Sequence, residues 1–134
     1  MVADGLLTVR SSLGPKQTMS KLEAEVKAKD MTVFARIDHA AGAKEVGLSL
    51  RPTEVLIFGN AKAGTALMQS GQTIGIDLPL KVLVWQDHTG VTWLAYNDLS
   101  WLVKRHDLGH ETAHAVNAMS AALAALAKAA TTSP

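Results

Sequence analysis

Residues 80–96 read LKVLVWQDHTGVTWLAY and constrain the architecture more than any other stretch of the chain. Two apolar runs, residues 80–86 and 91–96, flank the four residues 87–90, DHTG. A short connection that contains Asp and Gly between two strand-forming runs is a strong local signal for a β-hairpin. This segment therefore predicts two adjacent antiparallel strands, around which the rest of the sheet is to be placed.

Three further strands are predicted on the N-terminal side of the hairpin. Residues 5–11, GLLTVRS, form the first, and residues 31–38, MTVFARID, alternate as a half-buried strand does. The alternate apolar residues of this second strand are expected to share one face: Met31, Val33, Ala35 and Ile37. Residues 54–59, EVLIFG, are apolar at successive positions, which favours a central strand or one covered by a partner.

Helices are predicted in five segments from apolar spacing and from capping or terminating residues: 16–30, 40–48, 61–71, 101–106 and 110–128. The last segment carries an apolar stripe that needs a surface to pack against: Val116, Met119, Leu123 and Leu126. Strands and long helices do not alternate regularly along the chain. The sequence therefore predicts an α+β fold rather than a doubly wound sheet.

The composition narrows the classes of function. A chain of 134 residues is the usual size of one domain. A net charge of +1 and 4% aromatic residues argue against nucleic-acid binding, and the absence of cysteine excludes disulfides and thiolate sites. We see no signal-peptide pattern, and the apolar run at residues 120–130 is too short for a bilayer. We expect a cytoplasmic protein that binds neither nucleic acid nor membranes.

Residues 110–114, HETAH, match the H-E-x-x-H pattern of zinc hydrolases. On a helix, His110 and His114 lie one turn apart, where two imidazoles can chelate zinc, and Glu111 could act as a general base. His106 adds another histidine four residues earlier.

The context of this motif argues against a working zinc site. Catalytic zinc takes three protein ligands, and no His, Asp or Glu follows His114. Gly109 places His110 in the first turn, where its side chain need not point the same way as His114. We therefore predict no metal or other cofactor and keep zinc, bound by His110 and His114 with His106, as the alternative.

Residues 58–65, FGNAKAGT, join a predicted strand to a predicted helix. Gly59 and Gly64 have the spacing of the P-loop glycines, but Thr65 occupies the lysine position, so we exclude an NTPase. Two interpretations stay open. The segment is either a strand-to-helix turn that uses glycine for its backbone angles, or a weak anion site at a helix start.

Longer runs in the middle of the chain resemble a known family. FGN-x-K-x-GT-x-LM at residues 58–68 and DLPLK-x-LVW at residues 77–85 closely resemble the bacterial family called domain of unknown function 302, over about residues 6–108. Ala61 stands where that family typically has proline. The HETAH segment would then lie beyond the family's core, so we divide the chain into a domain at 1–109 and a C-terminal helical extension at 110–134 with a frayed tail.

This resemblance implies a fold related to the TATA-binding-protein type. Such a fold has a curved antiparallel sheet of about five strands, helices on one side and a β-α-β4-α core, here followed by a C-terminal helix. The resemblance also implies homodimers, and it carries no established biochemical activity. Sharing that fold does not imply DNA binding.

Eight polar residues at strand ends are the candidate ligand-binding set: Asp38, His39, Arg51, Asn60, Thr65, Asp77, Lys81 and Tyr96. If they converge, they form a pocket able to orient a small ligand, an anion among the options. Each also has a structural explanation as a cap, a turn residue or a surface side chain. Our leading hypothesis is a non-enzymatic, homodimeric small-ligand-binding domain. A metal-dependent hydrolase built on HETAH and a purely structural or interaction module are the alternatives.

Overall fold

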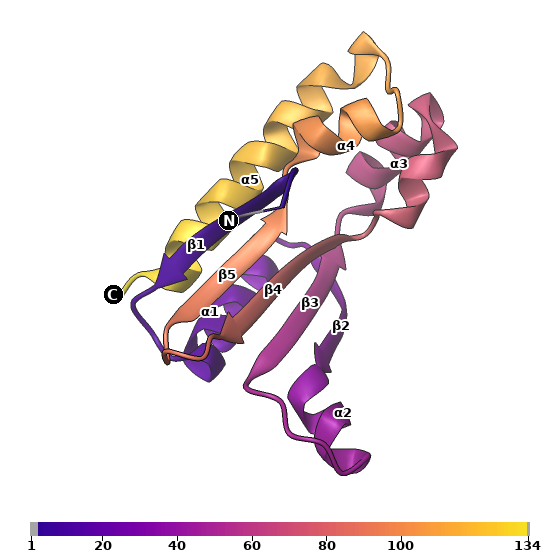
Figure 1. Cartoon of the computed structure of the whole chain (residues 1–134). Coiled ribbons are helices and arrows are strands. Elements are labelled where there is room, and N and C mark those ends of the chain that lie inside the picture. The colour runs from indigo at the N-terminus through magenta and orange to yellow at the C-terminus, as the bar shows by residue number, and fades with distance from the viewer. Residues whose placement is uncertain (1–2, 134) are drawn as a thin grey trace.

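The computed structural model describes residues 3–133, and its five strands form one antiparallel sheet (Figure 1). The strands pair in the order β1-β5-β4-β3-β2. Their bounds are β1 Leu6–Ser11, β2 Thr32–Asp38, β3 Thr53–Gly59, β4 Leu80–Gln86 and β5 Thr92–Asn97. The helices are α1 Pro15–Ala28, α2 His39–Glu45, α3 Ala61–Ser70, α4 Leu99–Arg105 and α5 Ala113–Thr131, with 3-10 turns η1 Gln72–Ile76 and η2 His110–Thr112. The predicted α+β fold is confirmed.

The β4–β5 hairpin closes through the side chain of Asp87. Its Oδ1 accepts hydrogen bonds from the backbone N–H groups of Thr89 and Val91, at 2.9 and 3.0 Å, and its Oδ2 accepts from Trp93 Nε1 at 2.8 Å. The Thr89 hydroxyl also donates to Oδ1, at 2.7 Å, and this bond together with the others holds the pKa of Asp87 below its ordinary value. Gly90 supplies the positive φ that the turn requires, at +87°.

One face of the sheet carries the core. Alternate residues of β3 and β4 point to this face, and Leu56, Phe58, Val82 and Val84 are 2% exposed or less. The long helix α1 packs over the centre of this face and contributes three fully buried apolar residues: Met19, Leu22 and Val26. In Figure 1 α1 lies behind the strands, so the sheet is seen from its opposite face.

The alternation predicted for β2 is interrupted by a β-bulge. The register shifts between Val33 and Ala35, so Val33 packs against the core while Ala35 and Ile37 point to the opposite face. The prediction that Met31, Val33, Ala35 and Ile37 share one face was therefore wrong. A bulge inserts one extra residue into the strand, which reverses the faces of the residues that follow.

The last helix belongs to the same core. Val116, Leu123 and Leu126 of α5 are buried, and α5 packs along α1 and β1. The predicted helix 110–128 is in fact two pieces, because η2 ends at Thr112 and α5 begins at Ala113. The boundary at residue 109 stays a prediction. Among the helices of residues 3–133, α5 included, none has both the length and the apolar character needed to cross a membrane.

Candidate functional site

A cavity of about 220 Å³ lies where the β3–α3 turn meets η1, the start of β4 and α5. Its walls are mostly apolar, and no charged side chain among residues 3–133 lines it. The lining consists of Phe34, Gly59, Asn60, Ala61, Gly64, Thr65, Met68, Gly75, Leu78, Pro79, Leu80 and Met119. Such a site favours an apolar molecule with few polar groups.

Three glycines leave the space that this cavity occupies. A Cβ atom on Gly64 would lie 3.8 Å from Leu78 Cδ1, one on Gly59 would lie 3.6 Å from the Cβ of Pro79, and one on Gly75 would lie 3.3 Å from the sulfur of Met68. Larger side chains at these positions would project into the same volume. The glycines of residues 58–65 therefore form one wall of the cavity, in addition to any role in the backbone geometry of the turn.

Asn60 and Thr65 provide the polar groups of the cavity. Asn60 is the N-cap of α3, and its Oδ1 accepts from the backbone N–H groups of Lys62 and Ala63 at 2.9 and 3.3 Å. Two of the amides that an anion would use at this helix start are therefore already bonded. The amide nitrogen of Asn60 and the Thr65 hydroxyl remain to orient a bound molecule.

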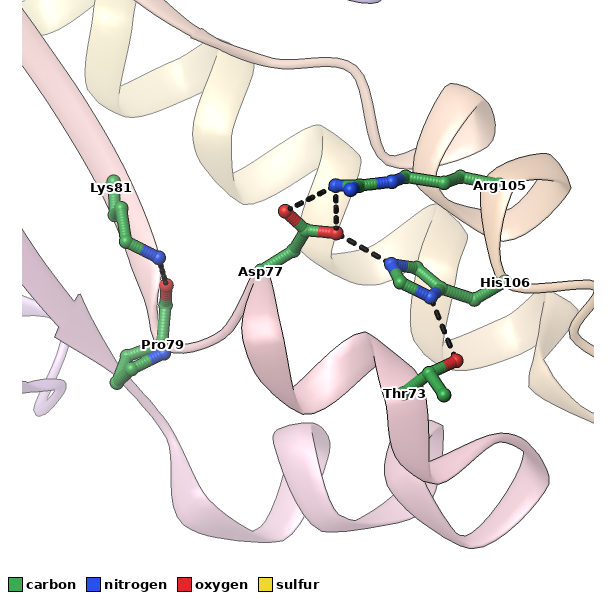
Figure 2. Close-up of polar contacts among 6 residues, drawn as sticks. All are labelled: Thr73, Asp77, Pro79, Lys81, Arg105 and His106. Carbon is green, nitrogen blue, oxygen red and sulfur yellow. Dashed lines mark hydrogen bonds and ion pairs between the residues drawn. The ribbon is translucent and has the colours of Figure 1, made fainter.

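A second polar cluster joins η1 to the end of α4 (Figure 2). Asp77 accepts two hydrogen bonds from Arg105 Nη1, at 2.9 and 3.0 Å, and a third contact of 2.5 Å from His106 Nε2. The other ring nitrogen of His106 lies 2.9 Å from the Thr73 hydroxyl. Hydroxyl, imidazole and carboxylate follow one another as in a hydrolase triad. However, the cavity beside Asp77 measures only about 10 Å³, too small for a substrate.

The HETAH segment is hydrogen-bonded to the end of α3 through Ser70. The Glu111 carboxylate accepts a hydrogen bond from the Ser70 hydroxyl at 2.7 Å, and Ser70 Oγ accepts from Gly109 N–H at 2.9 Å. The Ser70 bond is the main cause that lowers the pKa of Glu111. His110 lies in η2 and His114 in α5, so the expectation that one helix carries both was wrong. Within residues 3–133, no group of three His, Asp or Glu side chains is placed to hold a metal ion.

The other predicted site residues are spread over the fold. Asp38 caps α2 by accepting from Ala41 N–H at 2.9 Å, and His39 is the first, exposed residue of that helix. Arg51 is exposed just before β3. Lys81 donates to the carbonyl of Pro79 at 3.2 Å, as Figure 2 shows, and Tyr96 lines a small cavity beside α5.

Two of the eight predicted residues therefore line the cavity beside the β3–α3 turn, Asn60 and Thr65, and roles in ligand binding for the other six stay predictions. Sequence reasoning missed most of the lining. Gly64 could have been predicted as a lining residue, because it lies in the same motif as Asn60. Met119 carries no local signal, since only the packing of α5 brings it to this wall.

The sequence matches a family model described as "Domain of unknown function DUF302" over residues 7–126. The chain belongs to the DUF302 family. The match includes residues 110–114, so placing the HETAH segment beyond the family's core was wrong. The packing of α5 into the common core gives the physical reason, because that helix completes the fold.

Two relatives of this DUF302 chain come from Brucella. The chain is 48% identical over 119 residues to "Fluoride-specific ion channel FluC 1" of Brucella suis biovar 1, a match that covers 89% of this chain and 47% of that protein. It is equally similar to "Fluoride-specific ion channel FluC 2" of Brucella melitensis biotype 1, of which it covers 44%. The chain thus spans less than half the length of these relatives.

A solved structure shares the fold. The crystal structure of an uncharacterized conserved DUF302 protein from Bacillus stearothermophilus superposes with a TM-score of 0.82. The match covers 96% of this chain and 99% of that one, at 22% identity. At this identity the likeness shows the fold, and it agrees with the open five-stranded sheet described above.

Proposed function

We propose that the protein is a non-enzymatic, homodimeric domain that binds a small ligand in the cavity beside the β3–α3 turn. The observation that carries the proposal is the cavity itself, about 220 Å³ between apolar walls. Apolar surface that is left uncovered in such a pocket lacks the stabilisation that burial would supply. A chain that places Gly59, Gly64 and Gly75 around such a space gives up packing that larger side chains would supply.

The chemistry of the walls favours an uncharged ligand. An anion would find no lysine or arginine in the lining, and Asn60 already uses two amides at the start of α3. The volume is below the roughly 300 Å³ at which pockets for drug-sized molecules begin. We therefore infer a neutral molecule of about one aromatic ring, with a polar group that accepts from the Asn60 amide or pairs with the Thr65 hydroxyl.

Indole is a suitable probe, because it combines an apolar ring with one N–H group that can donate to the Thr65 hydroxyl oxygen. Titration calorimetry of indole into the intact chain is expected to show saturable binding of one molecule per chain. Gly64→Leu places a side chain into the cavity and is expected to abolish this binding. Gly42→Leu, in the exposed helix α2, is the matched control, since a Cβ there meets nothing within 4 Å. Absence of binding to wild type, or equal binding to Gly64→Leu, would overturn the proposal.

A second candidate function comes from the Brucella relatives. Their name is that of a fluoride channel, and the matched segment makes up 47% of the Brucella suis protein. Fluoride is a strongly hydrated anion, which the uncharged cavity does not suit. If the chain serves fluoride transport, we infer that it does so as an accessory domain beside the channel and not as the fluoride site.

Fluoride efflux from vesicles tests this second candidate. The full-length Brucella suis relative is compared with a version that lacks the matched segment, at equal amounts of inserted protein. We expect the deletion to change the rate of efflux or its regulation, and the isolated chain added outside to restore it in part. Equal efflux with and without the segment would remove this candidate.

A further inference from the structure

The sheet face opposite α1 and α5 is open and apolar. Direct partners across neighbouring strands point to the same side, and the row Ile37, Val55 and Leu83 therefore shares one face. This open face also carries Ile57 and the indoles of Trp85 and Trp93. Figure 1 looks onto it, and no helix lies in front of the strands.

The connection between β2 and β3 forms an arm whose helix contacts β3 within residues 3–133 but is otherwise largely exposed. It consists of α2 and the residues up to β3, and it projects beyond the end of the sheet (Figure 1). None of the seven residues of α2 is buried. The arm also displays Val46, Leu48 and Leu50, which are 72%, 66% and 50% exposed. A helix of seven residues with little tertiary packing is marginal in water, so this arm is expected to gain stability from a contact outside the chain.

The exposed area agrees with a missing partner. A compact monomer of 14.2 kDa exposes about 6,800 Å². The chain exposes 7894 Å², which is about 1,100 Å² more. A stable interface of standard size removes about 800 Å² from each partner. The excess is thus large enough to contain one such interface.

We propose that two copies of this chain pack open face to open face, around a twofold axis that crosses β4 near Leu83, with each arm lying against the partner. The charges favour a second copy over a nucleic acid, because the face carries only two cationic side chains, Arg10 and Lys81, among apolar ones. A twofold contact needs a self-complementary patch, and an apolar patch centred on one strand meets that condition. The inference rests on the homodimer of the proposed function and is independent of the cavity.

Analytical ultracentrifugation of the full chain tests the interface with a matched pair of variants. Ile37 lies on the open face and is 41% exposed, and Leu7 lies on the helix side of the sheet and is 42% exposed. Wild type and Leu7→Glu are expected to sediment at twice 14.2 kDa at micromolar concentration. Ile37→Glu is expected to raise the dissociation constant of the dimer at least tenfold. Leu48→Glu in the arm is expected to weaken the dimer without touching the core.

The outcomes separate the two proposals. If the wild type stays monomeric at all micromolar concentrations, both the interface and the homodimer are overturned. The proposal that the cavity binds a ligand is not affected by that result. A wild-type dimer that Ile37→Glu and Leu48→Glu both leave intact overturns this interface alone. A monomer that gains mass only with the remaining part of the Brucella suis relative assigns the open face to that protein and also overturns the inference.

Discussion

Trp85 of β4 and Trp93 of β5 are direct partners in the sheet register, and both indoles lie on the open face of the sheet. The hairpin turn fixes one of them, since Trp93 Nε1 donates to Asp87 Oδ2 at 2.8 Å. The proposed dimer would bury this pair against a second sheet. The two indoles therefore report on the interface without any added label.

Tryptophan fluorescence is expected to change when the protein is diluted. Dissociation would move Trp85 and Trp93 from an apolar contact into water, which shifts indole emission to longer wavelengths. The measurement is best made in a Trp101→Phe variant, because Trp101 lies on α4, is 38% exposed and would add a constant background. An emission maximum that stays the same from micromolar to low nanomolar concentration would speak against burial of the pair.

Gly64→Ala is expected to stabilise the protein while it weakens ligand binding. Alanine is favoured over glycine inside a helix by about 0.5–1 kcal/mol. The added Cβ would lie 3.8 Å from Leu78 Cδ1, an ordinary contact distance. Urea unfolding should show the gain in the free energy of unfolding, and indole titration should show the lower affinity. A loss of stability would show that the backbone at Gly64 needs glycine and that the cavity is not the reason for it.

Asn60→Ala is expected to destabilise the fold. It removes the side-chain oxygen that accepts from the N–H groups of Lys62 and Ala63, and loss of such a cap costs about 0.5–2 kcal/mol. Asn60→Asp keeps the accepting oxygen and should retain most of the stability, yet it replaces the amide that we assign to the ligand. Equal affinity for phenol, whose oxygen can accept from an amide N–H, in wild type and Asn60→Asp would exclude the amide as a ligand donor.

Glu111 is expected to make stability depend on pH in the acid range. The hydrogen bond from Ser70 lowers the pKa of Glu111 in the folded protein below its ordinary value of 4.5. A lowered pKa contributes stability that is present above the ordinary value and is lost as the pH falls through the folded value. Thermal unfolding of Glu111→Gln should therefore depend less on pH below about 4.5. The same acid dependence in wild type and variant would show that other carboxylates account for it.

Local features of the fold were predictable, because neighbouring residues determine them. Asp87 and Gly90 specify the hairpin turn, and Asp98 caps α4 by accepting from Ser100 N–H at 3.0 Å, as its position suggests. The bulge in β2 was not predictable. Val33 and Ile37 fit either face equally well as apolar residues, and only the pairing with β3 places them on opposite faces.

The candidate site was predictable only where its residues share one motif. Asn60 and Thr65 lie five positions apart in the chain and line the same cavity. Asp77 and His106 are 29 residues apart, and the contact between them arises because η1 meets the end of α4. Met119 reaches the cavity in the same way, through the packing of a distant helix. Tertiary contacts of this kind leave no periodicity or spacing in the sequence.

The most direct test of the proposed function is methyl NMR of the intact chain with ¹³C-labelled methionines during an indole titration. Met68 and Met119 line the cavity, whereas Met19 lies on the buried side of α1 and is fully buried in the core. We expect saturable shifts, and intermolecular Overhauser effects from indole, at Met68 and Met119 but not at Met19. Shifts that are absent, or that affect Met19 as strongly as the other two, would contradict a ligand site in this cavity.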